Sequence, residues 1–103
     1  MHRPRILQEA AEELDAAAAY LERERPGYAL VFLEAYEEKL GQLARFPETG
    51  PLIANAPGGY PLRAFLIGKF PYSIIAGSID DVVTIVAIAH TSREPNYWHS
   101  RVR

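Results

Sequence analysis

The feature that most constrains this chain is a pair of apolar stripes at helical spacing, separated by only a few residues. Members of each stripe recur three and four positions apart, as on one face of an α-helix. The first stripe contains Leu7, Ala10, Ala11, Leu14, Ala17, Ala18 and Leu21, and the second contains Ala29, Phe32, Leu33, Tyr36, Leu40 and Leu43. Between them, Pro26 disfavours helical dihedral angles at Arg25 and ends the first helix near Glu24. Because so short a connection makes the helices antiparallel neighbours, the sequence predicts a helical hairpin.

The acidic residues of the hairpin occupy positions away from these stripes. On the first helix they are Glu9, Glu12, Glu13, Asp15 and Glu22, and on the second Glu34, Glu37 and Glu38, accompanied by Lys39. Most of the acids of the first helix lie early, where the helix dipole favours negative charge. We therefore interpret these side chains as solvated helix faces, and not as catalytic carboxylates.

The second half of the chain begins with a predicted loop and continues with predicted strands. Residues 47–59 contain three prolines and three glycines, a composition that predicts a surface loop. Three β-rich runs follow at residues 62–67, 72–79 and 82–89, the last ending at His90. The turns between them are short, which predicts an antiparallel meander. A brief first strand is also expected at residues 3–7.

Together these elements predict a two-layer α+β domain in the order β-α-α-β-β-β. A short N-terminal strand precedes an antiparallel helical hairpin, which packs on one face of a small antiparallel sheet. The other face is expected to be an open, shallow surface. A chain of 103 residues is sufficient for one such domain, spanning residues 1–103.

Several classes of function are disfavoured by what the sequence lacks. It has no cysteine, no apolar run of about 18 residues and no signal-peptide core, so a cytoplasmic protein without membrane contact is expected. The histidines His2, His90 and His99 are scattered, which predicts no metal site. Gly58 and Gly59 neither follow a strand nor open a helix, so no phosphate-binding loop is expected. No cofactor is predicted.

Cations, an imidazole and aromatic side chains concentrate in the second half, where five Lys/Arg face three Asp/Glu; the first half has six against ten. The candidate site residues are Arg63, Lys69, His90, Arg93, Tyr97, Trp98 and Arg101. Such a group suits a phosphate, an acidic peptide or an acidic protein surface. Two plainer alternatives stay open: Trp98 as a lid on the core, and Arg101 with Arg103 as a frayed terminus.

The chain resembles the RelE/ParE superfamily, the toxins of type II toxin–antitoxin modules that are often labelled plasmid stabilisation proteins. The matching pieces run from residue 11 to residue 101, in the order of the family. They are Ala11-x-Glu-Leu14, Tyr20-Leu21-Glu22, Pro26-Gly27, Phe32-Leu33, Phe46-Pro47-Glu48-x-Gly50, Phe70-Pro71-Tyr72 and Ala87-Ile88-Ala89-His90-x-x-Arg93-x-Pro95-x-Tyr97-Trp98-x-x-Arg101. The resemblance implies the fold already predicted.

Two activities are implied by the resemblance. RelE-like members cleave mRNA on the ribosome without a metal, for which Arg63, His90, Arg93 and Tyr97 are the candidate catalytic residues. ParE-like members poison DNA gyrase and do not cut RNA. The net charge of −2 and the absence of a lysine cluster near Arg63 disfavour docking on RNA. We therefore expect a ParE-like gyrase inhibitor, with mRNA cleavage as the alternative and an inactive, antitoxin-binding module as the second alternative.

The resemblance also implies a cognate antitoxin and hence a hetero-oligomer. We expect an extended or helical segment of the antitoxin to lie along the hairpin and sheet, with its acids meeting Arg63, Arg93 or Arg101. Lys69 belongs to the same candidate binding set. Tyr97 and Trp98 are expected, with Arg101, to anchor a protein contact, because Trp, Tyr and Arg dominate interface hot spots.

Overall fold

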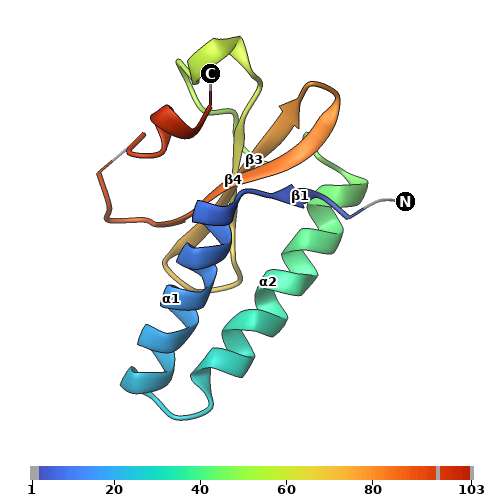
Figure 1. Ribbon diagram of the computed structural model, residues 1–103. Coiled ribbons are helices and arrows are strands. Elements are labelled where there is room, and N and C mark those ends of the chain that lie inside the picture. The colour runs from blue at the N-terminus through green and yellow to red at the C-terminus, as the bar shows by residue number, and fades with distance from the viewer. Residues whose placement is uncertain (1–2, 95, 103) are drawn as a thin grey trace.

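The computed structural model describes residues 3–94 and 96–102 of the chain. His2, Pro95 and Arg103, which belong to the patterns above, lie outside these ranges. The elements are β1 (Arg5–Ile6), α1 (Gln8–Glu24), α2 (Tyr28–Arg45), β2 (Arg63–Leu66), β3 (Tyr72–Ile79) and β4 (Val82–His90), with 3₁₀ turns η1 (Pro57–Gly59) and η2 (His99–Arg101). Figure 1 shows α1 and α2 side by side beneath the sheet, which confirms the predicted α+β order.

At the tip of the hairpin, a short turn after α1 leads into a capped start of α2. Gly27 has a φ of 89°, in the left-handed region that glycine adopts without a Cβ clash. The carboxylate of Glu22 accepts hydrogen bonds from the N–H of Gly27 at 3.0 and 3.1 Å and from that of Ala29 at 3.1 Å. These bonds satisfy amides that have no partner inside α2. Glu22 is exposed, as predicted, and it has the further role of capping the start of α2.

The sheet has the strand order β1-β4-β3-β2. The meander is confirmed, since β2 pairs with β3 and β3 with β4 in antiparallel fashion. The first strand differs from the prediction of a wholly antiparallel sheet: β1 runs parallel to β4, with Arg5 opposite Thr84 and Ile6 opposite Ile85. The sheet is therefore mixed. A parallel pair needs a long crossover between its strands, and here the hairpin and meander supply it.

The main core lies between the hairpin and the sheet. From the helices it receives Ala10, Ala17, Leu21, Phe32, Tyr36, Leu40 and Leu43, and from the sheet side Phe65, Ile67, Phe70, Ile74, Ala76, Ile85 and Ile88, all buried. A chain of edge-on aromatic contacts runs through this layer: Phe32 lies 5.4 Å from Tyr72 between ring centroids, and Tyr72 lies 5.0 Å from His90. These contacts fix the end of β4, where the candidate site begins.

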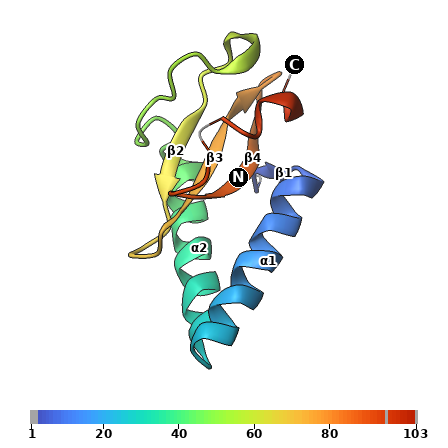
Figure 2. The ribbon, with the colours of Figure 1, turned by 90° about the vertical axis from the view of Figure 1, so that its left-hand side faces the viewer.

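The opposite face of the sheet, which was expected to be open, is covered over part of its area. A second cluster contains Leu62, Ile75, Val86, Ala87, Trp98 and Val102, all buried. The chain turns back after β4 and brings η2 beside that strand, as Figure 2 shows. Trp98 and Val102 seal the cluster from the C-terminal side, so the segment from residue 96 to residue 102 is part of the fold. Within the described residues, no helix is long and apolar enough to cross a membrane.

Candidate functional site

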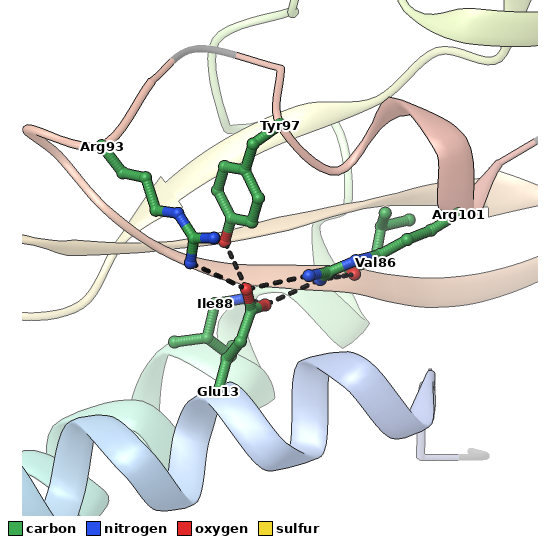
Figure 3. A network of polar contacts seen from close by, with 6 residues as sticks. All are labelled: Glu13, Val86, Ile88, Arg93, Tyr97 and Arg101. Atoms are coloured by element: carbon green, nitrogen blue, oxygen red, sulfur yellow. Dashed lines mark hydrogen bonds and ion pairs between the residues drawn. The ribbon is translucent and has the colours of Figure 1, made fainter.

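Glu13 lies at the centre of the largest polar network of the described structure (Figure 3). It projects from α1 toward the face of β4, where its Oε1 accepts the backbone N–H of Ile88 at 3.1 Å. Arg101 reaches the same carboxylate from η2 with a two-point hydrogen bond, 2.8 Å to Oε1 and 3.0 Å to Oε2. The prediction that Glu13 belongs to a solvated face was wrong: its side chain is only 15% exposed.

Tyr97 joins the network through its hydroxyl, which donates to Oε2 of Glu13 at 2.6 Å. Burial and the hydrogen bond to the Glu13 carboxylate raise the pKa of Tyr97 to about 12, because both disfavour a negative phenolate. The hydroxyl therefore stays protonated and remains engaged as a donor.

Arg93 and Arg101 share one carboxylate unequally. Arg101 is 15% exposed and also donates to the carbonyl of Val86 at 3.1 Å. Arg93 is 55% exposed, and its nearest approach to Glu13 is 3.6 Å. The Arg93 guanidinium instead lies over the Tyr97 ring, with its Cζ 3.8 Å from the ring centroid. One arginine is thus built into the fold and the other is largely presented to solvent.

The electrostatics of Glu13 follow from competing effects. Burial alone raises the pKa of its carboxyl, but hydrogen bonds from Arg101, Tyr97 and the Ile88 N–H outweigh burial, so the pKa lies below the ordinary value of 4.5. The hydrogen bond between Arg101 and Glu13 also raises the pKa of Arg101. Both groups are therefore charged at neutral pH.

His90 ends β4 next to this network and has its own local partner. Its Nδ1 accepts the backbone N–H of Ser92 at 3.0 Å and lies 2.7 Å from the Ser92 hydroxyl. A backbone N–H can only donate, so Nδ1 acts as an acceptor and the neutral ring carries its proton on Nε2. The ring is therefore set to donate from Nε2.

Two hollows meet at His90 and Arg93. One, of about 230 Å³, lies over the sheet face and includes Ile75, Glu94 and Trp98 in its walls. The other, of about 210 Å³, lies between α1 and the ends of β3 and β4; its lining is Glu13, Ala16, Ala17, Tyr72, Ile88, His90 and Arg93. Each hollow has room for a side chain of a partner.

The structure brings four of the seven predicted site residues together at a surface, places Trp98 in the wall of the hollow over the sheet face, and separates the other two. His90, Arg93, Tyr97 and Arg101 gather around Glu13. Arg63 does not join them. It lies on the hairpin-facing side of β2, as Phe65 does, and donates to the Gly50 carbonyl at 2.8 Å.

Lys69 lies apart from this group, whereas Trp98 is buried next to it. Lys69 is exposed in the turn between β2 and β3. Trp98 is 3% exposed within the second cluster, so the alternative of a core lid describes it and that of a surface anchor does not. Arg101 is likewise anchored, and the frayed-terminus alternative does not describe it.

Glu13 is the site residue that sequence reasoning missed. Its spacing within α1 is that of an exposed acid, and its partners lie more than 70 positions away. One signal was present: Glu13 is the acid of the segment Ala11-x-Glu-Leu14, which matches the family pattern. In the described residues, no three His, Cys, Asp or Glu side chains gather in a way that would hold a metal ion.

The structure thus combines a helical hairpin on a four-stranded sheet with a cationic and aromatic cluster at the end of the last strand. Residues 5–95 match the family described as ParE toxin of type II toxin-antitoxin system, parDE, and the chain belongs to this family. Among solved structures it is similar to a chain titled "Chromosomal ParDE TA system from P. aeruginosa", with a TM-score of 0.69 and 19% identity. That alignment covers 89% of this chain and all of the other, and shows the shared fold. No curated protein matches the sequence.

Proposed function

We propose that this type II toxin acts by binding DNA gyrase, without cleaving RNA, and that a cognate antitoxin neutralises it. Within the superfamily that the sequence resembles, gyrase poisoning is the activity of the ParE-like members. An encounter with gyrase requires a cytoplasmic location. The observation that carries the proposal is that the two side chains best suited to acid and base catalysis are already engaged in hydrogen bonds within the protein.

The candidate acid is Tyr97. Metal-free RNA cleavage needs a proton donor for the leaving oxygen. The Tyr97 hydroxyl is committed to Glu13 at 2.6 Å, and its pKa is raised to about 12. To protonate a leaving oxygen, the hydroxyl would have to break its hydrogen bond to Glu13 and give up a proton of unusually high pKa. Tyr97 is therefore a poor acid in this arrangement.

The candidate base is His90. Abstracting the 2′-hydroxyl proton needs a ring nitrogen with a free lone pair. Nδ1 of His90 accepts from Ser92, and the neutral ring therefore carries a proton on Nε2. Neither nitrogen offers a free lone pair without rearrangement of the turn after β4.

The cations needed to stabilise a phosphorane are also dispersed. Arg63 is bonded to Gly50 on the hairpin side of the sheet, and Arg101 is bonded to Glu13. Of the candidate catalytic arginines, Arg93 lies near His90, and its side chain is more than half exposed. Electrostatic stabilisation of a pentavalent phosphate relies on several converging donors, and this arrangement favours a binding surface instead.

For the antitoxin, the exposed apolar side chains of α2 and β2 support the expected segment along the hairpin and sheet. Leu30 and Val31 are 66% and 51% exposed on α2, and Phe46 is 61% exposed just beyond its end. Leu66 of β2 is 51% exposed and shares a hollow of about 440 Å³ with Phe46. Apolar anchors at these positions are what an amphipathic segment would bury.

The test compares two activities of the purified protein. Supercoiling by gyrase should be inhibited, and added antitoxin should restore it. Ribosome-dependent mRNA cleavage should be absent. The variant His90→Ala, if folded, should still inhibit gyrase, because inhibition by binding does not need a catalytic imidazole. Cleavage of mRNA by the wild type that His90→Ala abolishes, with folding intact, would refute the proposal.

A further inference from the structure

We infer that the hollow between α1 and the end of β4 is a binding site for a single carboxylate side chain of the target protein, with Arg93 as the residue that pairs with it. The identity of that target rests on the proposed function. The hollow has a volume of about 210 Å³, and Arg93, His90 and Tyr72 contribute to its wall.

The charged side chains beside the hollow are Glu13, Arg93 and Arg101. The single negative charge of Glu13 faces the guanidinium groups of both Arg93 and Arg101. Arg101 makes the close two-point bond, whereas Arg93 stays 3.6 Å away and more than half exposed. Arg101 is thus compensated by Glu13 at close range and also feels the charge of Glu9, whereas the positive charge of Arg93 has no close counter-charge. A partner carboxylate at hydrogen-bond distance would pair with Arg93 more closely than Glu13 does.

The Arg93 side chain is also held in position by its neighbours. Binding by a free arginine costs side-chain entropy, because its rotamers must be fixed. Here the Arg93 guanidinium is stacked 3.8 Å from the centroid of the Tyr97 ring, and Tyr97 is itself held by Glu13. Glu13, Tyr97 and Arg101 thus form a rigid support, and Arg93 is the contact residue mounted on it.

A second donor lines the same hollow. His90 carries its proton on Nε2, as its bond to Ser92 requires, and its ring is held edge-on against Tyr72 at 5.0 Å between centroids. Ala17 and Ile88 add apolar wall beside these donors. Donors together with an apolar wall match the carboxyl group and the methylene stem of a Glu or Asp side chain.

The surroundings favour a protein carboxylate over a nucleic-acid phosphate. Glu9, Glu12 and Asp15 of α1 are exposed on the same helix that forms one wall. A nucleic-acid strand would carry further phosphates past these acids, whereas a lone side chain avoids them. The neighbouring hollow over the sheet includes Glu94 in its wall, which also directs an incoming carboxylate to the α1 side.

The first experiment tests the site without gyrase. Side-chain NMR signals of Arg93 and His90 are followed in the purified protein during addition of sodium acetate, with sodium chloride at equal ionic strength as reference. We expect saturable shifts with acetate that Arg93→Ala abolishes. The control Arg23→Ala, an exposed arginine in the last turn of α1, makes the same change of charge and should leave the shifts intact. Absence of saturation in the wild type, or saturation by a short RNA oligonucleotide below the acetate concentration, would overturn the inference.

The second experiment asks whether the target uses the site. Arg93→Ala should raise the toxin concentration needed for half-inhibition of gyrase by about tenfold, as loss of an interface charge pair does, without a change in melting temperature. Arg23→Ala should stay within about twofold of wild type on the same scale. Equal loss in both variants would contradict a site at Arg93. A wild type that leaves gyrase unaffected would refute the proposed function, while the acetate titration still decides the site.

Discussion

The carboxylate of Glu13 and the guanidinium of Arg101, 88 positions apart in the chain, are joined by two hydrogen bonds of 2.8 and 3.0 Å. This pair fastens the C-terminal segment to α1. Because the segment carries Trp98 and Val102 over the second apolar cluster, the pair also holds that cluster closed. The polar network and the packing beneath it therefore depend on each other.

Glu13→Gln should destabilise the fold by about 2 kcal/mol, because hydrogen bonds to a charged group are worth more than neutral ones and Arg101 would lose its counter-charge. Urea unfolding at pH 7 measures the change. Asp15→Asn, an exposed acid on the same helix, is the matched control and should stay within about 0.5 kcal/mol of wild type. Equal stability of the Glu13 and Asp15 variants would show that the network contributes nothing to folding.

The stabilisation by Glu13 should depend on pH in the acid range. Its folded pKa lies below the ordinary 4.5, so the contribution is present above about pH 4.5 and is lost as the pH falls through the folded value. The difference in unfolding free energy between wild type and Glu13→Gln should thus be full at pH 7 and shrink below pH 4.5. A difference that stays constant down to pH 3 would contradict this mechanism.

Tyr97 should ionise at higher pH than the other tyrosines. Its pKa of about 12 derives from burial and from the Glu13 carboxylate, so Glu13→Gln should lower it toward the ordinary 10. The phenolate absorbance of Tyr97, isolated by subtracting the titration of Tyr97→Phe, measures this shift. An unchanged titration in Glu13→Gln would mean that the carboxylate does not hold the phenol.

Trp98→Ala should destabilise the protein by about 3–5 kcal/mol, the range for removing a large buried aromatic side chain. Trp98→Phe, which keeps most of the apolar volume, should cost clearly less. Urea titrations followed by circular dichroism measure both. In the wild type, Trp98 is the one tryptophan, and its fluorescence should shift to longer wavelength on unfolding. A stable, folded Trp98→Ala protein would place this side chain outside the core.

Much of the fold could be predicted because it depends on neighbours in the chain. The stripes from Leu7 to Leu21 and from Ala29 to Leu43 define two helices by periodicity, and the short connection at Pro26 and Gly27 makes them antiparallel. The short turns after residues 67 and 79 determine the meander in the same local way. The cationic and aromatic character of the C-terminal segment was also readable.

Tertiary structure alone decided what depends on distant residues. The sequence shows that Arg5 and Ile6 suit a strand, but their parallel pairing with β4 arises from packing across the whole chain. Strand alternation turns Arg63 toward the hairpin side, and the strand order places β3 between its strand and β4, apart from Arg93. Glu13 has the spacing of a solvated acid, and it becomes the centre of the site because folding brings Arg101 and Tyr97 to it. Periodicity determines which way a side chain faces along its own element, whereas the partner it meets there is set by the three-dimensional arrangement of all the elements.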